Sequence, residues 1–281
     1  MNASVNDARA VAPIEIEQHL KNLRVYGYTR VENYLPSDAV SRLLALVEKH
    51  HLGTRGFDYH GRPSRDARDK MVYNLQGKDK SFVELLDSPF LKSIFIPMLN
   101  DPFYRFLPPE APNYILSYYN ARSSGEKLDL HIDTYIPFPG ERTYAMQAAF
   151  VLEEHFPDNG CTVVVPGSHT LGTYTDRGLQ KVEPLLAKPG DLVIWDSRLW
   201  HGTTENISGR SRWTLIATLT SWWIKQNMDI PRSLPDAVYR MLSDPQKVLL
   251  GFCSIPPSNE TQRINTKTGY ESLLASVEDY R

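Results

Sequence analysis

The spacing of apolar residues predicts helices at both ends of the chain. Ile14, Ile16, Leu20 and Leu23 follow helical spacing, and this helix leads through Gly27 into a short extended segment. Further helical patterns cover residues 37–53 and the segments SFVELLD, FLKSIFIPMLN, LPDAVYRMLS, DPQKVLLGF and YESLLASVEDY. The first third and the last fifth of the chain are therefore expected to be mainly helical.

Between these ends, the pattern changes to short runs rich in β-branched and aromatic residues. The runs are NYILSYYN, KLDLHID, TYAMQAAFVL, CTVVV, DLVIW and RWTLIATLTSWW, separated by turn-forming segments such as SSGEK and KPGD. Many short strands without helices between them favour a sandwich or barrel and exclude a doubly wound parallel sheet. We predict a mainly β fold with flanking helices and an antiparallel jelly-roll core. A single domain is expected over residues 1–281, with a helix-rich part (1–108), the core (109–225) and a helical extension (226–281).

Composition narrows the class of partner. The 281 residues include 31 basic and 33 acidic side chains, and no long block of Lys and Arg indicates binding to nucleic acid or to a membrane. A small-molecule substrate is the expected partner, with the chain acting as a monomer or a homodimer. Cys161 and Cys253 are the two cysteines, which argues against a disulfide framework, and the N-terminus has no signal-peptide pattern. We expect a cytoplasmic protein.

The segment KLDLHIDTY holds the first candidate for a metal site. His131 and Asp133 are two residues apart, so on a strand their side chains point to the same face while Ile132 points to the other. A third ligand must come from elsewhere, and His201 is the candidate. Two imidazoles and one carboxylate form the facial triad of non-haem Fe(II) oxygenases. A surface hydrogen bond is the ordinary alternative for a lone His-x-Asp pair, and His155 or His169 could replace His201.

A second strand pattern brings an arginine near this candidate site. We interpret residues 190–215 as a strand that ends at His201, the turn GTTENISGR, and a strand on which Arg212 returns antiparallel to it. An arginine on an apolar strand needs an anionic partner, and its guanidinium group suits a carboxylate. The alternatives are an arginine that covers the sheet surface, and Arg210 in place of Arg212.

These segments together resemble the phytanoyl-CoA dioxygenase family of Fe(II)- and 2-oxoglutarate-dependent oxygenases. The matching stretches are LHIDTY, AAFVLEEHFPDNGCTVVVPGSH and KPGDLVIWDSRLWHGTTENISGRSRW. The resemblance implies a double-stranded β-helix core. It also implies that His131, Asp133 and His201 bind Fe(II), and that 2-oxoglutarate and O2 are co-substrates. Such an enzyme releases succinate and CO2 while it hydroxylates, desaturates or cyclises a small organic metabolite.

The resemblance assigns further roles around the metal. Arg212 matches the residue that anchors the distal carboxylate of 2-oxoglutarate, and Thr162 and Gln147 fall at positions that contact this co-substrate. Leu128 departs from the family pattern, in which several members have Gln three residues before the first histidine. Related halogenases have a small residue in place of Asp133, so a carboxylate there indicates oxidation without halogenation.

The substrate pocket is expected to combine aromatic and polar side chains, because ligand sites are apolar clefts with few polar groups. The candidate residues are Tyr73, Asn74, Tyr135, Phe138, Arg198 and Trp223. Two other functions remain open from the sequence. One is a cupin-type metalloenzyme that uses dioxygen without 2-oxoglutarate, and the other is a metal-free jelly-roll binding module.

Overall fold

The computed structural model describes residues 13–52, 69–104, 107–134, 137 and 140–256. Its helices are α1 (Pro13–Tyr26), α2 (Ser37–Leu52), α3 (Lys80–Leu86), α4 (Pro89–Leu99), α5 (Ile230–Ser233), α6 (Asp236–Tyr239) and α7 (Asp244–Leu249). Its strands are β1 (Tyr28–Val31), β2 (Lys70–Val72), β3 (Tyr114–Ser123), β4 (Leu128–His131), β5 (Ala145–Val151), β6 (Thr162–Val164), β7 (Glu183–Pro184), β8 (Leu192–Asp196), β9 (His201–Thr203) and β10 (Thr214–Ser221). Short 3-10 turns lie at Leu75–Gly77 and Ser168–Thr170.

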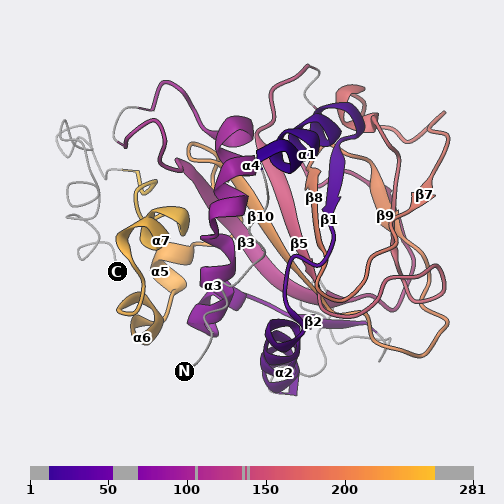
Figure 1. Ribbon diagram of the computed structural model, residues 1–281, viewed down its shortest axis with the longest axis horizontal. Coiled ribbons are helices and arrows are strands. Elements are labelled where there is room, and N and C mark those ends of the chain that lie inside the picture. Colours follow the sequence, from indigo (N-terminus) through magenta and orange to yellow (C-terminus); the bar gives the residue numbers. More distant parts are fainter. Residues whose placement is uncertain (1–12, 53–68, 105–106, 135–136, 138–139, 257–281) are drawn as a thin grey trace.

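The strands form two antiparallel sheets that make a double-stranded β-helix. The larger sheet has the order β1-β8-β5-β10-β3-β2, and the smaller has the order β4-β9-β6-β7 (Figure 1). Neighbours in a sheet are far apart in the sequence, as in the pairing of β1 with β8 and of β4 with β9. The predicted mainly β jelly-roll fold with flanking helices is therefore confirmed.

The two faces of the larger sheet bury different sets of side chains. On β5, Ala148 and Phe150 belong to a core shared with the helices, whereas Ala149 and Val151 belong to a smaller cluster that also contains Val164 of the opposite sheet. The alternation follows from the two-residue period of a strand. One face thus packs under helices, and the other faces the space between the sheets.

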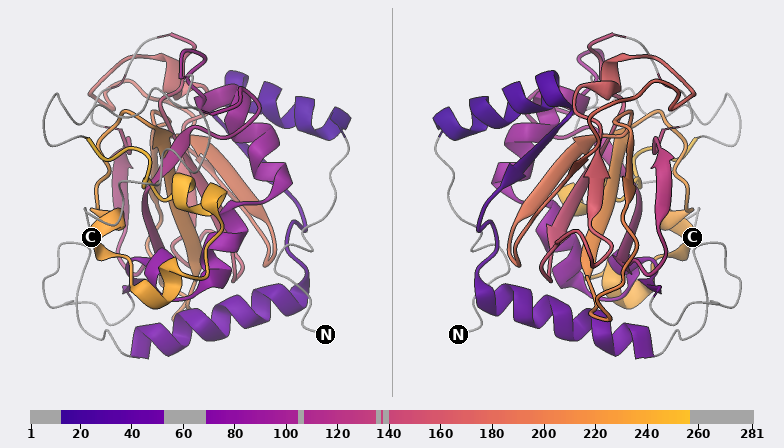
Figure 2. Two further views of the ribbon diagram at one scale, coloured as in Figure 1. Left: turned by 90° about the vertical axis from the view of Figure 1, so that its left-hand side faces the viewer. Right: turned by 90° about the vertical axis from the view of Figure 1, so that its right-hand side faces the viewer.

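Helices α3 and α4 lie across the outer face of the larger sheet (Figure 1). Helix α4 begins where the Ser88 side chain accepts a hydrogen bond from the backbone N–H of Leu91, with Pro89 in the first turn. The side views show α2 beneath one end of the strands and α1 near the other (Figure 2). No helix within the described ranges has both the length and the apolar character needed to cross a lipid bilayer.

One sequence prediction about the strands is wrong. His201 does not end the strand that begins at Leu192. That strand, β8, ends at Asp196, a tight turn follows in which the backbone N–H of Leu199 donates to Asp196, and His201 opens β9 in the other sheet. Strands β9 and β10 therefore do not pair with each other. The predicted helix YESLLASVEDY lies outside the described residues.

Candidate metal centre

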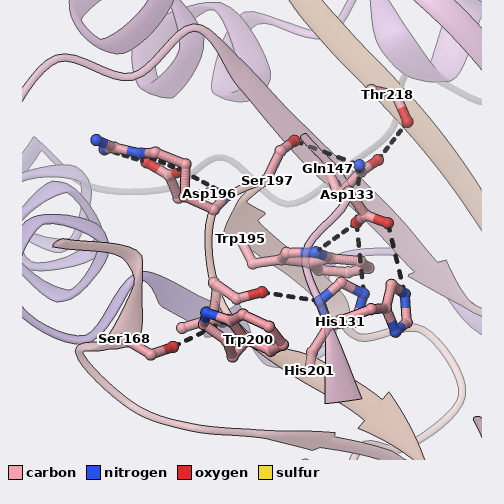
Figure 3. Close-up of polar contacts among 12 residues, drawn as sticks. His131, Asp133, Gln147, Ser168, Trp195, Asp196, Ser197, Trp200, His201 and Thr218 are labelled. Carbon is pink, nitrogen blue, oxygen red and sulfur yellow. Dashed lines mark hydrogen bonds and ion pairs between the residues drawn. The ribbon is translucent and has the colours of Figure 1, made fainter. Parts of the chain in front are cut away.

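Three ligand side chains meet at the edge of the smaller sheet. His131 ends β4 and faces His201 at the start of β9, while Asp133 lies in the turn after β4. One donor atom from each residue lies within 4.8 Å of the others. The Nε2 atom of His201 is 3.4 Å from Oδ2 of Asp133, and Nε2 of His131 is 3.8 Å from Oδ1 (Figure 3). Donors bound to one ion at about 2.1 Å lie roughly 3 Å apart in a cis arrangement, so the three side chains fit a single metal with a small contraction.

Backbone carbonyls orient both imidazoles. Nδ1 of His131 lies 2.9 Å from the carbonyl oxygen of Asp129, and Nδ1 of His201 lies 2.9 Å from that of Leu199. A carbonyl can only accept, so Nδ1 carries a proton in each ring, which leaves Nε2 as the atom that can bind a metal. Burial, followed by the nearby His201, lowers the pKa of His131, which favours the neutral form that binds metal.

The carboxylate of Asp133 is held from the larger sheet. Nε2 of Gln147 donates to Oδ2 of Asp133 at 3.0 Å, and Nε1 of Trp195 donates to the same oxygen at 3.2 Å. Thr218 donates to the other end of the Gln147 amide at 2.5 Å. The backbone N–H of Asp133 in turn donates to the carbonyl of Ser197 at 2.9 Å. Such hydrogen bonds fix a ligand before the metal binds.

The PGSH segment supports the turn that leads into His201. Oγ of Ser168 accepts a hydrogen bond from the backbone N–H of Trp200 at 2.9 Å, and Val165 donates to the carbonyl of Trp200 at 2.9 Å. His169 is buried, its Nε2 lies 3.2 Å from the carbonyl of Arg24, and burial lowers its pKa. This histidine is not part of the metal cluster.

Arg212 lies at the far end of a cavity that begins at the metal cluster. This cavity has a volume of about 90 Å³ between the two sheets, and its lining includes His131, Asp133, His201, Thr162 and Arg212. The last few residues before β10 place the arginine side chain on the inner side of the larger sheet. The structure thus brings three of the predicted metal ligands and two of the predicted co-substrate contacts to one cavity.

The guanidinium group of Arg212 is buried among neutral partners. The residue is 3% exposed, its Nη2 donates to Oγ of Ser124 at 3.0 Å, and its Nη1 lies 3.4 Å from Nε2 of His155. Within the described ranges, its Nε atom has no hydrogen-bond partner. Burial, and then the charge of Arg122, lower the pKa of Arg212 to about 10, so the group remains a cation at neutral pH. A buried cation of this kind fits an anionic ligand.

The other predicted site residues lie at different distances from this cavity. Gln147 contacts Asp133, as described above, and does not line the cavity itself. Asn74 donates through its backbone to Asn120, a lining residue, and half-buried Tyr73 precedes it. Tyr135 and Phe138 lie outside the described residues.

Arg198 and Trp223 are placed away from the metal. Arg198 is buried and forms an ion pair with Asp196 at 2.8 Å, on the helix-facing side of the larger sheet. Asp196 points away from the metal cluster (Figure 3). Arg198 lines a second cavity of about 1010 Å³ instead. Trp223 is half exposed, with its ring edge against Tyr144.

The sequence analysis gave no role to Trp195 or Arg122 and considered His155 only as an alternative metal ligand. In the structure, Trp195 donates to Asp133, Arg122 lines the cavity, and His155 lies beside Arg212 and outside the metal cluster. The available signal was the strand alternation: Trp195 shares the inward face of β8 with Val193, and Arg122 follows Asn120 at a spacing of two on β3.

Comparisons with known proteins agree with this arrangement. The chain is 35% identical to the "Uncharacterized protein Rv1501" of Mycobacterium tuberculosis over 109 residues, which cover 37% of this chain and 39% of that protein. It is 29% identical to "Dioxygenase af480" of Aspergillus fumigatus over 141 residues, which cover 48% of this chain and 46% of that protein. The chain therefore spans less than half the length of the curated relatives it matches.

Solved structures share the fold. HygX from Streptomyces hygroscopicus, solved with nickel and 2-oxoglutarate bound, superposes with a TM-score of 0.60 at 14% identity, over 78% of this chain and 90% of that one. At this identity the likeness concerns the fold alone.

The sequence profile of the family described as phytanoyl-CoA dioxygenase (PhyH) matches residues 23–214. This range contains the three candidate metal ligands and Arg212, and it covers more than half of the chain. The family expected from the sequence is confirmed. The chain belongs to the phytanoyl-CoA dioxygenase (PhyH) family.

Proposed function

We propose that this protein is an Fe(II)- and 2-oxoglutarate-dependent oxygenase that hydroxylates a small organic metabolite. One observation carries the proposal: a three-residue metal cluster and a buried, uncompensated arginine line the same cavity. His131, Asp133 and His201 would hold the Fe(II) ion. When bound, the ion supplies dioxygen activation that couples decarboxylation of 2-oxoglutarate, giving succinate and CO2, to oxidation of a substrate C–H bond.

The residues of the chain orient and neutralise the ligands. Nδ1 protonation fixes the two imidazoles as neutral Nε2 donors, and Gln147 and Trp195 hold the Asp133 carboxylate. Asp133 supplies the single negative charge of the cluster, and its presence favours hydroxylation over halogenation. Three protein ligands leave open positions on the metal, as a site that binds co-substrate and dioxygen requires.

Arg212 distinguishes this proposal from a metalloenzyme that does not use 2-oxoglutarate. A guanidinium group that is 3% exposed, with only neutral partners, carries a large desolvation cost. The distal carboxylate of a dicarboxylate co-substrate offsets that cost with charge-assisted hydrogen bonds. A cupin-type enzyme or a metal-free binding module would have no use for this buried cation.

One wall of the cavity is suited to a small organic substrate. Met71, Tyr118 and Asn120, from β2 and β3, line the cavity on the side opposite β4. They offer apolar surface with a phenol and an amide, and this mixture suits a molecule with both apolar and polar groups. The fold relative HygX has also been solved with nickel, 2-oxoglutarate and hygromycin B bound, which is consistent with a small-molecule substrate here.

The test is an anaerobic titration of the purified protein with Fe(II) and then 2-oxoglutarate. A bidentate chelate gives a weak visible charge-transfer band, which we expect in the wild type and not in His201→Ala. Asp129→Asn is the matched control, because that side chain is 93% exposed and only its backbone contacts His131. A folded wild-type protein that binds Fe(II) without the band would favour the cupin-type enzyme. Absence of Fe(II) binding would favour the binding module.

A further inference from the structure

A second arginine lines the same cavity as Arg212. The inward face of β3 presents Tyr118, Asn120 and Arg122 to the cavity. Arg122 pairs across the sheet with Thr214 on β10. Thr214 follows Arg212 by two residues in the sequence. The two guanidinium groups therefore approach the same end of the cavity, one from β3 and the other from the segment that leads into β10. Their mutual repulsion contributes to the lowered pKa of Arg212.

The charge of these two arginines is poorly balanced. Among the described residues, Arg122 has a carboxylate, that of Asp69, only at 4.0 Å, and the same oxygen also accepts a hydrogen bond from the backbone N–H of Gly125. Arg212 forms no ion pair within the described part of the chain, and its neighbour His155 has a pKa well below its usual range because it is buried. Both guanidinium groups keep a buried Nε–H that has no partner among the described residues. Leaving such donors of a cationic group unpaired is costly, and an acceptor that carries negative charge is the strongest partner for them.

We infer that Arg122 is a second anion-binding residue, and that the distal carboxylate of 2-oxoglutarate is held between Arg122 and Arg212. This inference rests on the proposed function, since it concerns the co-substrate of the same site. The two oxygen atoms of this carboxylate would accept hydrogen bonds from both unpaired Nε–H groups. Its negative charge would also offset the repulsion between the two guanidinium cations. The site then selects a co-substrate with a full negative charge at both ends, and succinate, the dicarboxylate product, is a ligand of the same two arginines.

Arg122 should contribute less than Arg212 to the binding of the carboxylate, because it is more exposed. The Arg122 side chain is 22% exposed, so water screens part of its interaction, whereas Arg212 is fully enclosed. Neutralising Arg122 should weaken 2-oxoglutarate binding about tenfold, the effect of one partly screened charge-assisted contact. Replacing it with lysine keeps the charge without the planar fork and should cost less.

The experiment measures the dissociation constant of 2-oxoglutarate from the anaerobic Fe(II) protein, for the wild type, Arg122→Gln and Arg122→Lys. Arg142→Gln is the matched control: it removes the same charge from an exposed residue that lines the other cavity. We expect a rise of about tenfold for Arg122→Gln, a smaller rise for Arg122→Lys and no change for Arg142→Gln. The dissociation constant of Fe(II) alone should stay the same in all four proteins, which separates anion binding from damage to the metal site.

A second probe does not need the metal. Succinate should raise the thermal unfolding midpoint of the metal-free wild type and of Arg142→Gln, and raise that of Arg122→Gln much less. If Arg122→Gln does not fold, Arg122→Met gives the same comparison. A 2-oxoglutarate dissociation constant within twofold of the wild type in a folded Arg122 variant would overturn the inference. Failure of the wild type to bind 2-oxoglutarate would instead overturn the proposed function, and the succinate comparison would still decide whether Arg122 binds anions.

Discussion

The two ends of the cavity are built in opposite ways. The metal end uses the edge of the smaller sheet and a turn, and its one carboxylate, Asp133, gives it a negative charge, with His131 and Asp133 partly exposed and His201 buried. The arginine end uses the larger sheet, is enclosed, and carries the positive charges of Arg122 and Arg212. A ligand that bridges the ends must bind a cation with one group and present an anion with the other. Under the proposed function, this contrast would fix the direction in which a 2-oxo dicarboxylate lies.

The two ends of the cavity are also expected to contribute differently to the stability of the folded protein. At the metal end every ligand has a hydrogen bond that orients it, and Asp133 has two side-chain donors. At the arginine end a cation is buried without a carboxylate partner in the described chain. We expect the first end to be nearly neutral for folding and the second to be destabilising until its ligand binds.

The largest expected effect comes from Arg212→Met, which removes the buried cation and keeps the aliphatic length. Binding of 2-oxoglutarate should weaken about 100-fold or more, because a buried charge pair is lost. The free energy of unfolding of the ligand-free protein should rise by about 1 kcal/mol or more, because the uncompensated charge is gone. Denaturant unfolding and an anaerobic 2-oxoglutarate titration measure the two quantities.

The control is Arg210→Met, two residues away, where the guanidinium group stacks on Phe156 at 5.5 Å and is exposed. This variant should leave 2-oxoglutarate binding unchanged and should not stabilise the protein. A destabilised Arg212→Met protein would mean that the contacts of Arg212 with Ser124 and His155 outweigh its desolvation, and the comparison of the two ends would then be wrong.

An intermediate effect is expected at the metal end from Gln147→Leu. This change removes the amide that donates to Asp133 and leaves the ligand to Trp195 alone. Fe(II) affinity should fall about 10- to 100-fold, as for other residues that orient a metal ligand. An anaerobic Fe(II) titration measures it, with Thr218→Val as the graded variant, since Thr218 only orients Gln147. Equal Fe(II) affinity in wild type and Gln147→Leu would show that the carboxylate needs no such support.

The smallest effect is a pH dependence of stability from His155. Burial lowers its pKa in the folded state well below the ordinary 6.5, so the unfolded chain binds a proton that the folded protein does not. Stability from this group is therefore present above pH 6.5 and is lost as the pH falls below it, by up to about 1.4 kcal/mol per pH unit. His155→Gln, which keeps an acceptor for Arg212, should flatten the change in unfolding free energy between pH 7.5 and 5.5. An equally steep change in this variant would assign the effect to other groups.

The candidate metal ligands and Arg212 could be proposed from the sequence, whereas the residues that hold them in place could not. His131, Asp133 and His201 could be proposed because two imidazoles and a carboxylate fit a facial triad and because the surrounding motifs resemble one family. Arg212 was proposed from a predicted strand, but it lies just before β10. Trp195 and His155 could not be assigned, because a tryptophan or histidine on a buried strand is ordinary until its cross-sheet partner is known. Arg122 was missed for the same reason.

The pattern of short apolar runs was enough to predict the fold. No local sequence pattern, however, indicates that the chain passes from the larger sheet to the smaller one at residues 197–200. Residues 192–203 are mainly apolar, with three polar residues in the middle at 196–198. In the sequence, the turn that begins at Asp196 therefore looks like part of one longer strand. Strands of two or three residues, such as β7 and β9, are too short to show a period of two. Their existence depends on pairing with β6, which the sequence does not reveal.

The turn between β8 and β9 also has a consequence for how the protein is made. Trp195 and its partner Asp133 are 62 residues apart in the chain, and His201 follows later still. A ribosome-bound chain that has exposed only the first two ligands offers a metal one imidazole and one carboxylate, without the third ligand or the tryptophan that holds the carboxylate. An Fe(II) ion would therefore meet its full set of ligands only after strands of both sheets have been made and have paired.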